Sequence, residues 1–255
     1  MPQTDSTVRF SNRVENYIRY RPGYPKGIVE TLQNECQLTS TSVVADIASG
    51  TGIFTRVLLE NGNNVFGVEP NREMREAAER LLSSYPNFVS IAGTAEETTL
   101  QAHSVDFVTA AQAAHWFDLA RARTEFARIL RPAGWAVLIW NERSTDTTPF
   151  LRDYEQLLTT YGTDYQQVRH ENTTGKLNTF FAPSAFAERT FDMQQNFEYA
   201  ELEGRLLSSS YAPLADNPNY AAMLTRLRRI FDDHQTEGRV GMEYRTRMYY
   251  GRLSE

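Results

Sequence analysis

The sequence has few of the residues that build disulfides and metal sites. Among 255 residues there is one cysteine, Cys36, and the four histidines are scattered at positions 103, 115, 170 and 234. A single cysteine cannot form an internal disulfide, and no cysteine or histidine cluster has the spacing of a metal site. We therefore expect no metal, and we expect a cytoplasmic location.

Long apolar runs are also absent. No run approaches the roughly 18 apolar residues of a membrane span, and the opening stretch MPQTDSTVRF lacks the apolar core of a signal peptide. The formal net charge of −6 disfavours wholesale binding to nucleic acid. The arginines of RLRRIF (226–231) fit the solvated face of an amphipathic helix, so they do not indicate a nucleic-acid site.

The first half of the chain alternates short apolar runs with amphipathic segments. The pattern predicts helices from residue 53, at 71–82 with Asn71 as N-cap, and at 116–130, closed by Arg131-Pro132. Strands are predicted at 43–47, 64–70, 87–93, 104–111 and 134–140. Strands that alternate with helices in this way predict a parallel sheet of right-handed βαβ units.

The second half has a different pattern. Polar residues with helical patches at 149–172 precede an expected loop at 173–180, and 218–235 is amphipathic. Apolar residues alternate at 191–199 and 240–250, as in strands with one solvated face, and both are best placed in the same sheet. We therefore prefer one domain (1–255) over two. Its predicted parts are cap helices (1–40), a core (41–148), an inserted lid (149–185), and last strands and helices (186–255).

A short loop of small residues follows the first predicted strand, in the sequence DIASGTG (46–52). Gly50 and Gly52 let the backbone turn tightly and approach a ligand. The P-loop pattern is absent, and the dinucleotide fingerprint would need glycine or alanine where Thr55 stands. Taken alone, the loop has the alternative explanation of a tight strand-to-helix turn.

Two acidic residues near the loop indicate which kind of ligand it binds. Glu69 ends the second strand, where a carboxylate can accept both hydroxyls of a ribose, although it also suits the start of the following helix. Asp46 ends the first strand and suits a ligand with an ammonium or sulfonium group better than a pyrophosphate. The site therefore favours a positively charged nucleoside.

At these residues the sequence resembles the class I S-adenosylmethionine-dependent methyltransferases, from about residue 9 to 140. The matching stretches are VVADIASGTGIFTRVLLENGNNVFGVEPNREM (43–74), GTAEE (93–97), VDFVTAAQAAHWFD (105–118) and ARTEFARILRPAGWAVLIW. The resemblance implies an α/β fold, a doubly wound, seven-stranded, mostly parallel sheet with an antiparallel last strand and a helical lid insertion. The cofactor would be S-adenosyl-L-methionine, the product S-adenosyl-L-homocysteine, and the acceptor a small molecule.

The resemblance also implies roles for individual residues. Asp46, Ala48 and Gly50, with Gly52 in the same loop, would line the methionine part of the cofactor, and Glu69 would hold its ribose. The adenine would lie near Pro70, Met74, Thr94, Ala95 and Glu96, and the sulfonium above Ala111 and Gln112. The sequence departs from the usual pattern at Ala48, which replaces a glycine and fits if its φ is negative. It also departs at Thr94, where many members have aspartate.

The loop after the fourth strand would face the transferred methyl group. His115 is a candidate general base, because the ordinary pKa of histidine suits proton removal near neutral pH. It could instead only orient the loop or cap the next helix. Trp116 and Phe117 would either wall the substrate or anchor that helix. A carboxylate acceptor would need no base, because it is already ionised.

The N-terminal segment FSNRVENYIRYRPGYP (10–25) resembles a cofactor-covering helix in the branch of trans-aconitate methyltransferase-like proteins. Tyr17, Arg21 and Tyr24 are candidates to touch the cofactor or an acidic substrate, with Arg21 able to pair with a carboxylate. The alternative is a surface helix that merely packs on the sheet. GRLLSSSYAP (204–213) also resembles that branch near its substrate pocket, without roles for single residues.

Three functions remain open from the residues. The first is methyl transfer to a carboxylate, a phenol or a ring carbon. The second is a nicotinamide-dependent oxidoreductase. Three features argue against it: Asp46, the missing third glycine and the scarcity of lysine. The third is a cofactor-binding protein without catalysis. The oligomeric state is not indicated.

Overall fold

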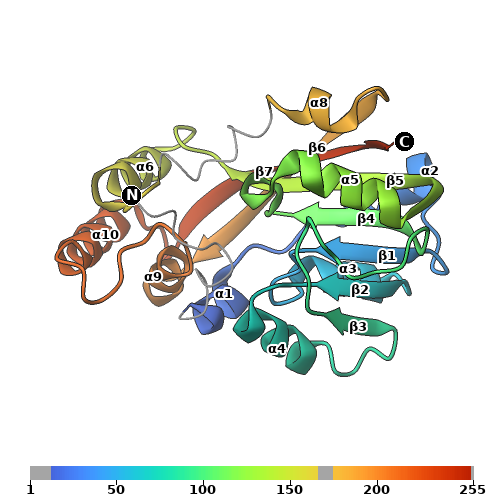
Figure 1. Ribbon diagram of the computed structural model, residues 1–255. Coiled ribbons are helices and arrows are strands. Elements are labelled where there is room, and N and C mark those ends of the chain that lie inside the picture. The colour runs from blue at the N-terminus through green and yellow to red at the C-terminus, as the bar shows by residue number, and fades with distance from the viewer. Residues whose placement is uncertain (1–12, 166–174, 254–255) are drawn as a thin grey trace.

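The computed structural model describes residues 13–165 and 175–253, which form a seven-stranded sheet in the order β3-β2-β1-β4-β5-β7-β6 (Figure 1). The strands β1 to β5 are parallel, and β7 is antiparallel to both β5 and β6. The strand bounds are β1 Val43–Ile47, β2 Asn64–Val68, β3 Phe88–Ile91, β4 Val105–Ala111, β5 Leu130–Arg143, β6 Phe186–Phe197 and β7 Val240–Arg252. The predicted α/β fold class is confirmed.

The strand order reverses between β1 and β4. From β1 the chain proceeds outward to β2 and β3, then returns to place β4 on the other side of β1. The carboxyl ends of β1 and β4 therefore diverge into loops on opposite faces of the sheet, which opens a crevice for a ligand.

Helices cover both faces of the sheet (Figure 1). On one face, α2 (Gly27–Cys36), α3 (Ile53–Glu60) and α4 (Arg72–Leu81) bury apolar residues against the strands. On the other face, α5 (Leu119–Ile129) and α8 (Leu177–Phe181) do the same. Burial on both faces explains why β1 is an almost continuous apolar run rather than an alternating one.

A third apolar cluster lies where β6 and β7 extend beyond the other strands. It contains α6 (Pro149–Tyr161), α9 (Tyr199–Leu207) and α10 (Tyr220–His234), which pack around buried residues of both strands, including Tyr244 (Figure 1). The crevice at the sheet edge thus lies between the core and this helical cluster.

The short helix α1 (Val14–Tyr20) has no buried residue of its own and is held from its flanks. Arg13 donates hydrogen bonds to the carbonyl oxygens of Leu207 at 3.0 Å, Ser209 at 2.6 Å and Ala212 at 2.7 Å. A Cβ on Gly204 would lie 2.1 Å from Cε2 of Tyr20, so only glycine allows this close approach of α1 and α9.

Local signals placed several boundaries correctly. The strand predicted at 43–47 matches β1, and the predicted cap is present, since Oδ1 of Asn71 accepts from the Met74 backbone N–H at 2.9 Å. The late strands and the amphipathic helix also occur, although β6 lies at 186–197 rather than 191–199.

Three predictions about boundaries were wrong. The loop expected at 173–180 ends in helix α8, because Phe180 packs edge-on against Phe126 with ring centroids 6.0 Å apart; residues 173 and 174 lie outside the described chain. The helix expected from 116 starts at Leu119, after Asp118 accepts from the backbone of Ala120 and Arg121. The strand expected at 134–140 begins earlier, at Leu130 in β5, although α5 does end at Ile129, just before Arg131-Pro132, as predicted.

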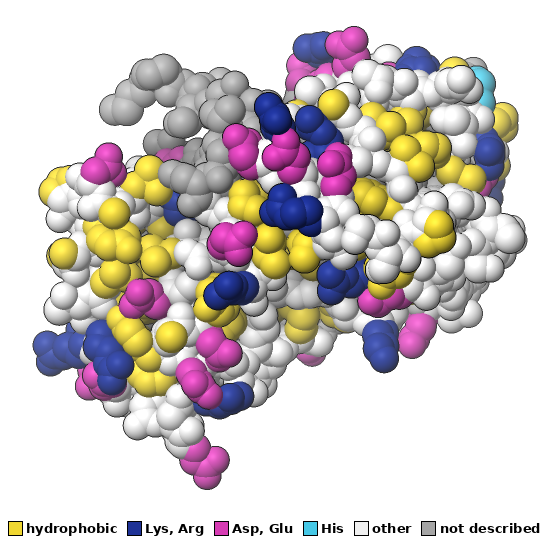
Figure 2. Space-filling view, turned by 90° about the horizontal axis from the view of Figure 1, so that it is seen from below, with side chains coloured by type: hydrophobic (Ala, Val, Ile, Leu, Met, Phe, Trp, Pro, Cys, Tyr) yellow, Lys and Arg dark blue, Asp and Glu magenta, His cyan; other side chains and the backbone are white. Residues whose placement is uncertain are grey.

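No helix in the described ranges is long and apolar enough to cross a membrane. The face seen in Figure 2 carries acidic and basic side chains intermingled rather than a continuous basic band. The division into cap, core, lid and last strands remains a prediction.

Candidate functional site

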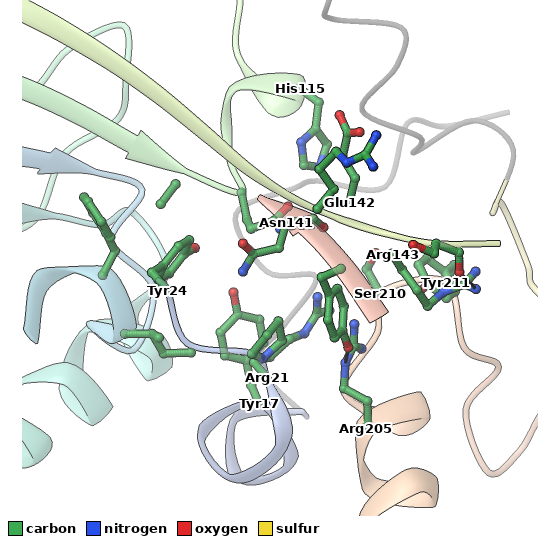
Figure 3. Close-up of a pocket in the computed structure, with 18 of the residues that line it drawn as sticks. Tyr17, Arg21, Tyr24, His115, Asn141, Glu142, Arg143, Arg205, Ser210 and Tyr211 are labelled. Atoms are coloured by element: carbon green, nitrogen blue, oxygen red, sulfur yellow. Dashed lines mark hydrogen bonds between the residues drawn. The ribbon is translucent and has the colours of Figure 1, made fainter. Parts of the chain in front are cut away.

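A cavity of about 430 Å³ opens at the carboxyl ends of β1 and β4. Its walls include the loops after these strands, the end of β5, the segment from α1 to the turn after it, and the end of α9 with the loop that follows (Figure 3). The start of β7 also lines it. It lies at the switch point of the sheet, where open α/β sheets bind ligands.

Asp46 lies near the carboxyl end of β1, lines the cavity and is 1% exposed. Its carboxylate accepts from the Thr55 hydroxyl at 2.6 Å and from the Thr109 hydroxyl at 2.9 Å. Burial raises the pKa of Asp46 to about 6, and the threonine hydrogen bonds only partly oppose this. A cation in the cavity would stabilise the ionised form.

The loop after β1 contains three residues with positive φ, namely Ala48 at 52°, Gly50 at 58° and Gly52 at 84°. The condition under which alanine would fit at position 48, a negative φ, is therefore not met. The turn needs the left-handed conformation there, because the next residue's N–H reaches back to the Val68 carbonyl at 3.2 Å. Alanine therefore carries a backbone strain of about 1 kcal/mol that glycine would avoid.

Glu69 ties this loop to the start of α4. One carboxylate oxygen accepts from the Gly50 N–H and the other from the Asn71 N–H, each at 2.8 Å. Burial raises the pKa of Glu69, against the lowering effect of these two backbone donors. The carboxylate thus lies beside the loop, as the sequence led us to expect, although it is not among the residues that line the cavity.

The residues predicted around an adenine also lie outside the cavity lining. Met74 is buried, with its Cε atom 3.5 Å from where a Cβ on Gly50 would be. The Thr94 hydroxyl accepts from the Glu97 N–H at 3.1 Å, and Glu96 accepts from the Asp118 N–H at 2.9 Å. Pro70 and Ala95 are likewise absent from the lining.

The loop after β4 does reach the cavity, through Ala111, Gln112, His115 and Trp116. Gln112 has a positive φ of 57°, and its side-chain amide donates to the Asn141 carbonyl at 3.0 Å. The rings of His115 and Trp116 are tilted, with centroids 4.7 Å apart. Phe117 does not line the cavity and packs instead against Phe126 in the core, with ring centroids 6.3 Å apart.

The predicted N-terminal candidates Tyr17, Arg21 and Tyr24 all line the cavity. Tyr24 packs edge-on against Phe54 with centroids 5.0 Å apart, and burial raises the pKa of its phenol well above the ordinary value. The guanidinium of Arg21 lies 4.9 Å from the centre of the Tyr17 ring. α1 and its following turn therefore form a wall of the cavity.

Arg143, Arg205 and Tyr211 form a basic and phenolic part of the cavity wall to which sequence reasoning assigned no role (Figure 3). Tyr244 also lines the cavity. Arg143 forms an ion pair with Glu155. Arg205 is 6% exposed and donates to the Tyr244 hydroxyl at 3.2 Å. The segment 204–213 had been singled out near a substrate pocket, but nothing in its pattern told which side chains point inward.

Within the described ranges, no group of three or more histidine, cysteine, aspartate or glutamate side chains is arranged to hold a metal ion.

Residues 45–138 match the family described as methyltransferase domain. An uncharacterized methyltransferase of Mycobacterium tuberculosis is 41% identical over 139 residues, which cover 54% of this chain and 54% of that protein. The chain thus spans about half the length of the mycobacterial relatives it matches. An uncharacterized methyltransferase of Schizosaccharomyces pombe is 28% identical over 202 residues, 79% of this chain and 72% of that protein.

Solved structures share the fold. A proposed type II methyltransferase from Anaeromyxobacter dehalogenans superposes with a TM-score of 0.66 at 21% identity, covering 92% of this chain and 98% of that one. An S-adenosylmethionine-dependent methyltransferase from Aquifex aeolicus gives 0.52 at 15% identity, covering 71% and 90%. The sequence comparison thus matches residues 45–138 to a methyltransferase domain, and the structural comparison shows a shared fold.

Proposed function

We propose that this chain, whose residues 45–138 match the methyltransferase domain family, transfers the methyl group of S-adenosylmethionine to a small-molecule acceptor. The observation that carries the proposal is the position of Asp46, a buried carboxylate at the switch point of a sheet with the methyltransferase fold. A buried acid with a raised pKa suits a cationic ligand and disfavours a pyrophosphate. This geometry speaks against the nicotinamide alternative.

The residues present fit the cofactor. Asp46, Ala48 and Gly50 would hold its methionine part, with Gly52 shaping the turn. Each oxygen of Glu69 accepts one backbone N–H, and a carboxylate offers about four acceptor sites, so capacity remains for two ribose hydroxyls. Pro70, Met74, Thr94, Ala95 and Glu96 would surround the adenine.

When bound, S-adenosylmethionine supplies an activated methyl group, whose transfer by in-line displacement leaves S-adenosylhomocysteine. The protein contributes mainly position and exclusion of water. Ala111 and Gln112 form the floor, and Tyr17 and Tyr24 form a wall that excludes water. His115 would accept the proton of a hydroxyl acceptor, whereas a carboxylate acceptor needs none.

The finer parts of the proposal concern the outer elements. The N-terminal segment around Arg21 supports a place near the trans-aconitate methyltransferase-like branch, and the helices of 149–185 would act as a lid. These parts depend on the acceptor, which the domain match does not specify.

Calorimetric titration tests the cofactor. We expect micromolar binding of S-adenosylmethionine and S-adenosylhomocysteine and no binding of NAD. Glu69→Gln keeps the side-chain shape and removes the charge, and should weaken both adenosyl ligands by about tenfold. Glu30→Gln, on the exposed face of α2, is the matched control and should change nothing. Binding of NAD alone would overturn the proposal.

Turnover then separates an enzyme from a binding protein. We expect transfer of a labelled methyl group to at least one member of a panel of carboxylic acids, phenols and amines. Cofactor binding without transfer to any member of the panel would favour the binding protein.

A further inference from the structure

Two arginines at one end of the cavity have no carboxylate partner among the described residues. Arg205 donates to the hydroxyls of Tyr244 at 3.2 Å and Ser209 at 3.0 Å. Arg21 donates from Nη2 to the Ser208 carbonyl at 3.0 Å. Burying a charge without a partner of opposite charge is costly, so we expect a negative group to face these two side chains.

Tyr211 is a group at this end of the cavity that can carry a negative charge. It follows α9, is half-buried and lines the cavity near Arg143 and Arg205 (Figure 3). Its carbonyl oxygen accepts from the Thr163 N–H at 3.0 Å, and its ring packs edge-on against the Tyr165 ring with centroids 4.9 Å apart. These contacts of the backbone and the ring fix the position of the phenol.

Three positive groups act on the phenol of Tyr211, from α9, β5 and the turn after α1. Burial raises the pKa of this phenol, but the charges of Arg205, Arg143 and Arg21 outweigh burial and hold the pKa below the ordinary value of tyrosine. Arg143 is itself paired with Glu155, whereas the other two have no such partner in the described ranges. A phenolate at Tyr211 therefore supplies the negative charge that the arginines lack.

A chain of hydrogen bonds connects Arg205 to this phenol through Ser209. Because Oγ of Ser209 accepts from Nη1 of Arg205 at 3.0 Å, its hydroxyl proton points toward another acceptor. The Ser209 side chain is hydrogen-bonded to Tyr211. A hydroxyl that accepts from a guanidinium group donates more strongly, so the chain stabilises the ionised form of Tyr211.

The neighbouring phenols leave the negative charge to Tyr211. Burial raises the pKa of Tyr154 in α6 and of Tyr165 after it, so both keep their protons. Tyr244 in β7 donates its hydroxyl proton to Sδ of Met242 at 2.9 Å. Tyr211 is therefore the phenol of this group that the surrounding charges favour as an anion.

We infer that the phenolate of Tyr211 accepts the proton of a phenolic hydroxyl on the acceptor. The inference rests on the proposed function and specifies its substrate class. A base is most effective when its pKa lies near the operating pH, and the net lowering of the pKa of Tyr211 moves it in that direction. His115, which reaches the cavity from the loop after β4, is the other candidate for this proton.

The cavity also has aromatic walls that suit a flat ring. The aromatic side chains that line it with Tyr211 include Tyr17, Trp116, Tyr165 and Tyr244. Aromatic rings pack favourably against one another in offset or edge-on arrangements. A phenol combines such a ring with a weakly acidic hydroxyl, whereas an aliphatic carboxylic acid has neither.

In the proposed step, the O–H bond of the acceptor breaks and its proton goes to Oη of Tyr211. The acceptor oxygen forms a bond to the methyl carbon, the bond between that carbon and the sulfonium sulfur breaks, and its electron pair stays on the sulfur. The products are a methyl ether and S-adenosylhomocysteine. The proton on Tyr211 then leaves to solvent, which restores the phenolate.

Methyl transfer to phenols of different acidity tests the inference on the full chain. The probes are phenol and 4-nitrophenol, with butyrate as a carboxylic acid and benzylamine as an amine, in mildly alkaline buffer with S-adenosylmethionine. We expect transfer to both phenols and none to butyrate. Transfer to butyrate or benzylamine but to neither phenol would overturn the inference and leave the proposed function intact.

Tyr211→Phe separates proton transfer from packing, because it keeps the ring. It should lower kcat/KM for phenol at least about 100-fold, since a general base typically contributes that much. For 4-nitrophenol, which is already ionised in this buffer, the loss should be less than about threefold. Equal losses for the two phenols would show a structural role and overturn the inference.

Tyr220→Phe, on α10 and outside the cavity lining, is the matched control and should change neither value. His115→Gln tests the other candidate. A loss confined to phenol in His115→Gln and absent from Tyr211→Phe would assign the proton to His115 and overturn the inference. If Tyr211→Phe does not fold, Ser209→Ala removes the hydroxyl bonded to the phenolate, and should lower kcat/KM for phenol by about tenfold and spare 4-nitrophenol.

Ultraviolet titration of the ligand-free chain tests the phenolate without an acceptor. The difference between the wild type and Tyr211→Phe reports the ionisation of Tyr211, which we expect at a lower pH than that of free tyrosine. Ionisation at or above the pH of free tyrosine overturns the inference. If neither adenosyl ligand binds the wild type, the proposed function fails and the inference with it, whatever the titration shows.

Discussion

The side chain of Asn141 in β5 donates from Nδ2 to the carbonyl oxygen of Gly23 at 3.0 Å and so joins residues 118 positions apart in the sequence. Its Oδ1 accepts from the Thr246 hydroxyl at 2.7 Å. Asn141 is 8% exposed, and through these bonds a core strand fixes the turn that carries Arg21 and Tyr24 into the cavity.

Asn141→Leu should therefore destabilise the fold by about 2–4 kcal/mol, because both partners lose a buried hydrogen bond. Chemical denaturation measures the change. Thr246→Val removes only the bond on the β7 side and should cost about 1–2 kcal/mol. Equal costs for the two variants would show that the bond to Gly23 contributes nothing.

Asp46 should make stability depend on pH. Its pKa is raised from 3.8 to about 6 in the folded state, so the folded chain binds the proton more tightly than the unfolded one. The free energy of unfolding is therefore largest below the pKa of the unfolded state and falls as the pH rises through about 6. Asp46→Asn removes this penalty and should stabilise the fold by about 1–2 kcal/mol at neutral pH, with little gain at about pH 4. Thermal unfolding at both pH values checks this, and a gain independent of pH contradicts it.

Ala48→Gly should relieve the strain of the loop after β1. Removing the Cβ at a φ of 52° should stabilise the fold by about 0.5–1 kcal/mol. Ala133→Gly is the matched control, because Ala133 has a φ of 66° and is exposed away from the cavity. Both variants should gain similar stability in denaturant titrations, while only Ala48→Gly should alter cofactor affinity. A loss of stability in Ala48→Gly would show that the left-handed turn is not strained.

Gly204→Ala should separate α1 from α9. The added Cβ would lie 2.1 Å from the Tyr20 ring, so the ring or the helix must move, at a cost of about 1–3 kcal/mol. The double variant Gly204→Ala/Tyr20→Ala should be less destabilised than the sum of the two single variants. Strict additivity in this cycle would rule out the clash as the cause.

Tyr211 should report the charge of its surroundings. Three arginines lower the pKa of its phenol against the effect of burial. Arg205→Met should raise this pKa, as measured by ultraviolet titration of phenol ionisation, with Tyr211→Phe identifying the signal. A pKa unchanged by Arg205→Met would mean that Arg205 does not act on this phenol.

Local sequence patterns correctly predicted the parallel half of the sheet, the loop at 46–52 and the cap at Asn71. These features follow from local rules: apolar runs form buried strands, small residues permit the tight turn, and a side-chain oxygen caps the nearest N–H groups. The positions of Asp46 and Glu69 followed from the same rules, since each directly follows or ends a strand.

Other features depend on contacts between residues that are far apart in the sequence. α8 forms because Phe180 packs against Phe126. The positive φ of Ala48 accompanies the hydrogen bond from the backbone N–H of the next residue to the Val68 carbonyl in β2. Arg21 and Arg205 meet because α1 and α9 dock through Gly204, a contact that depends on the whole fold. Periodicity reports which face of an element is apolar, but the charge that surrounds a side chain is set by residues brought from far along the chain.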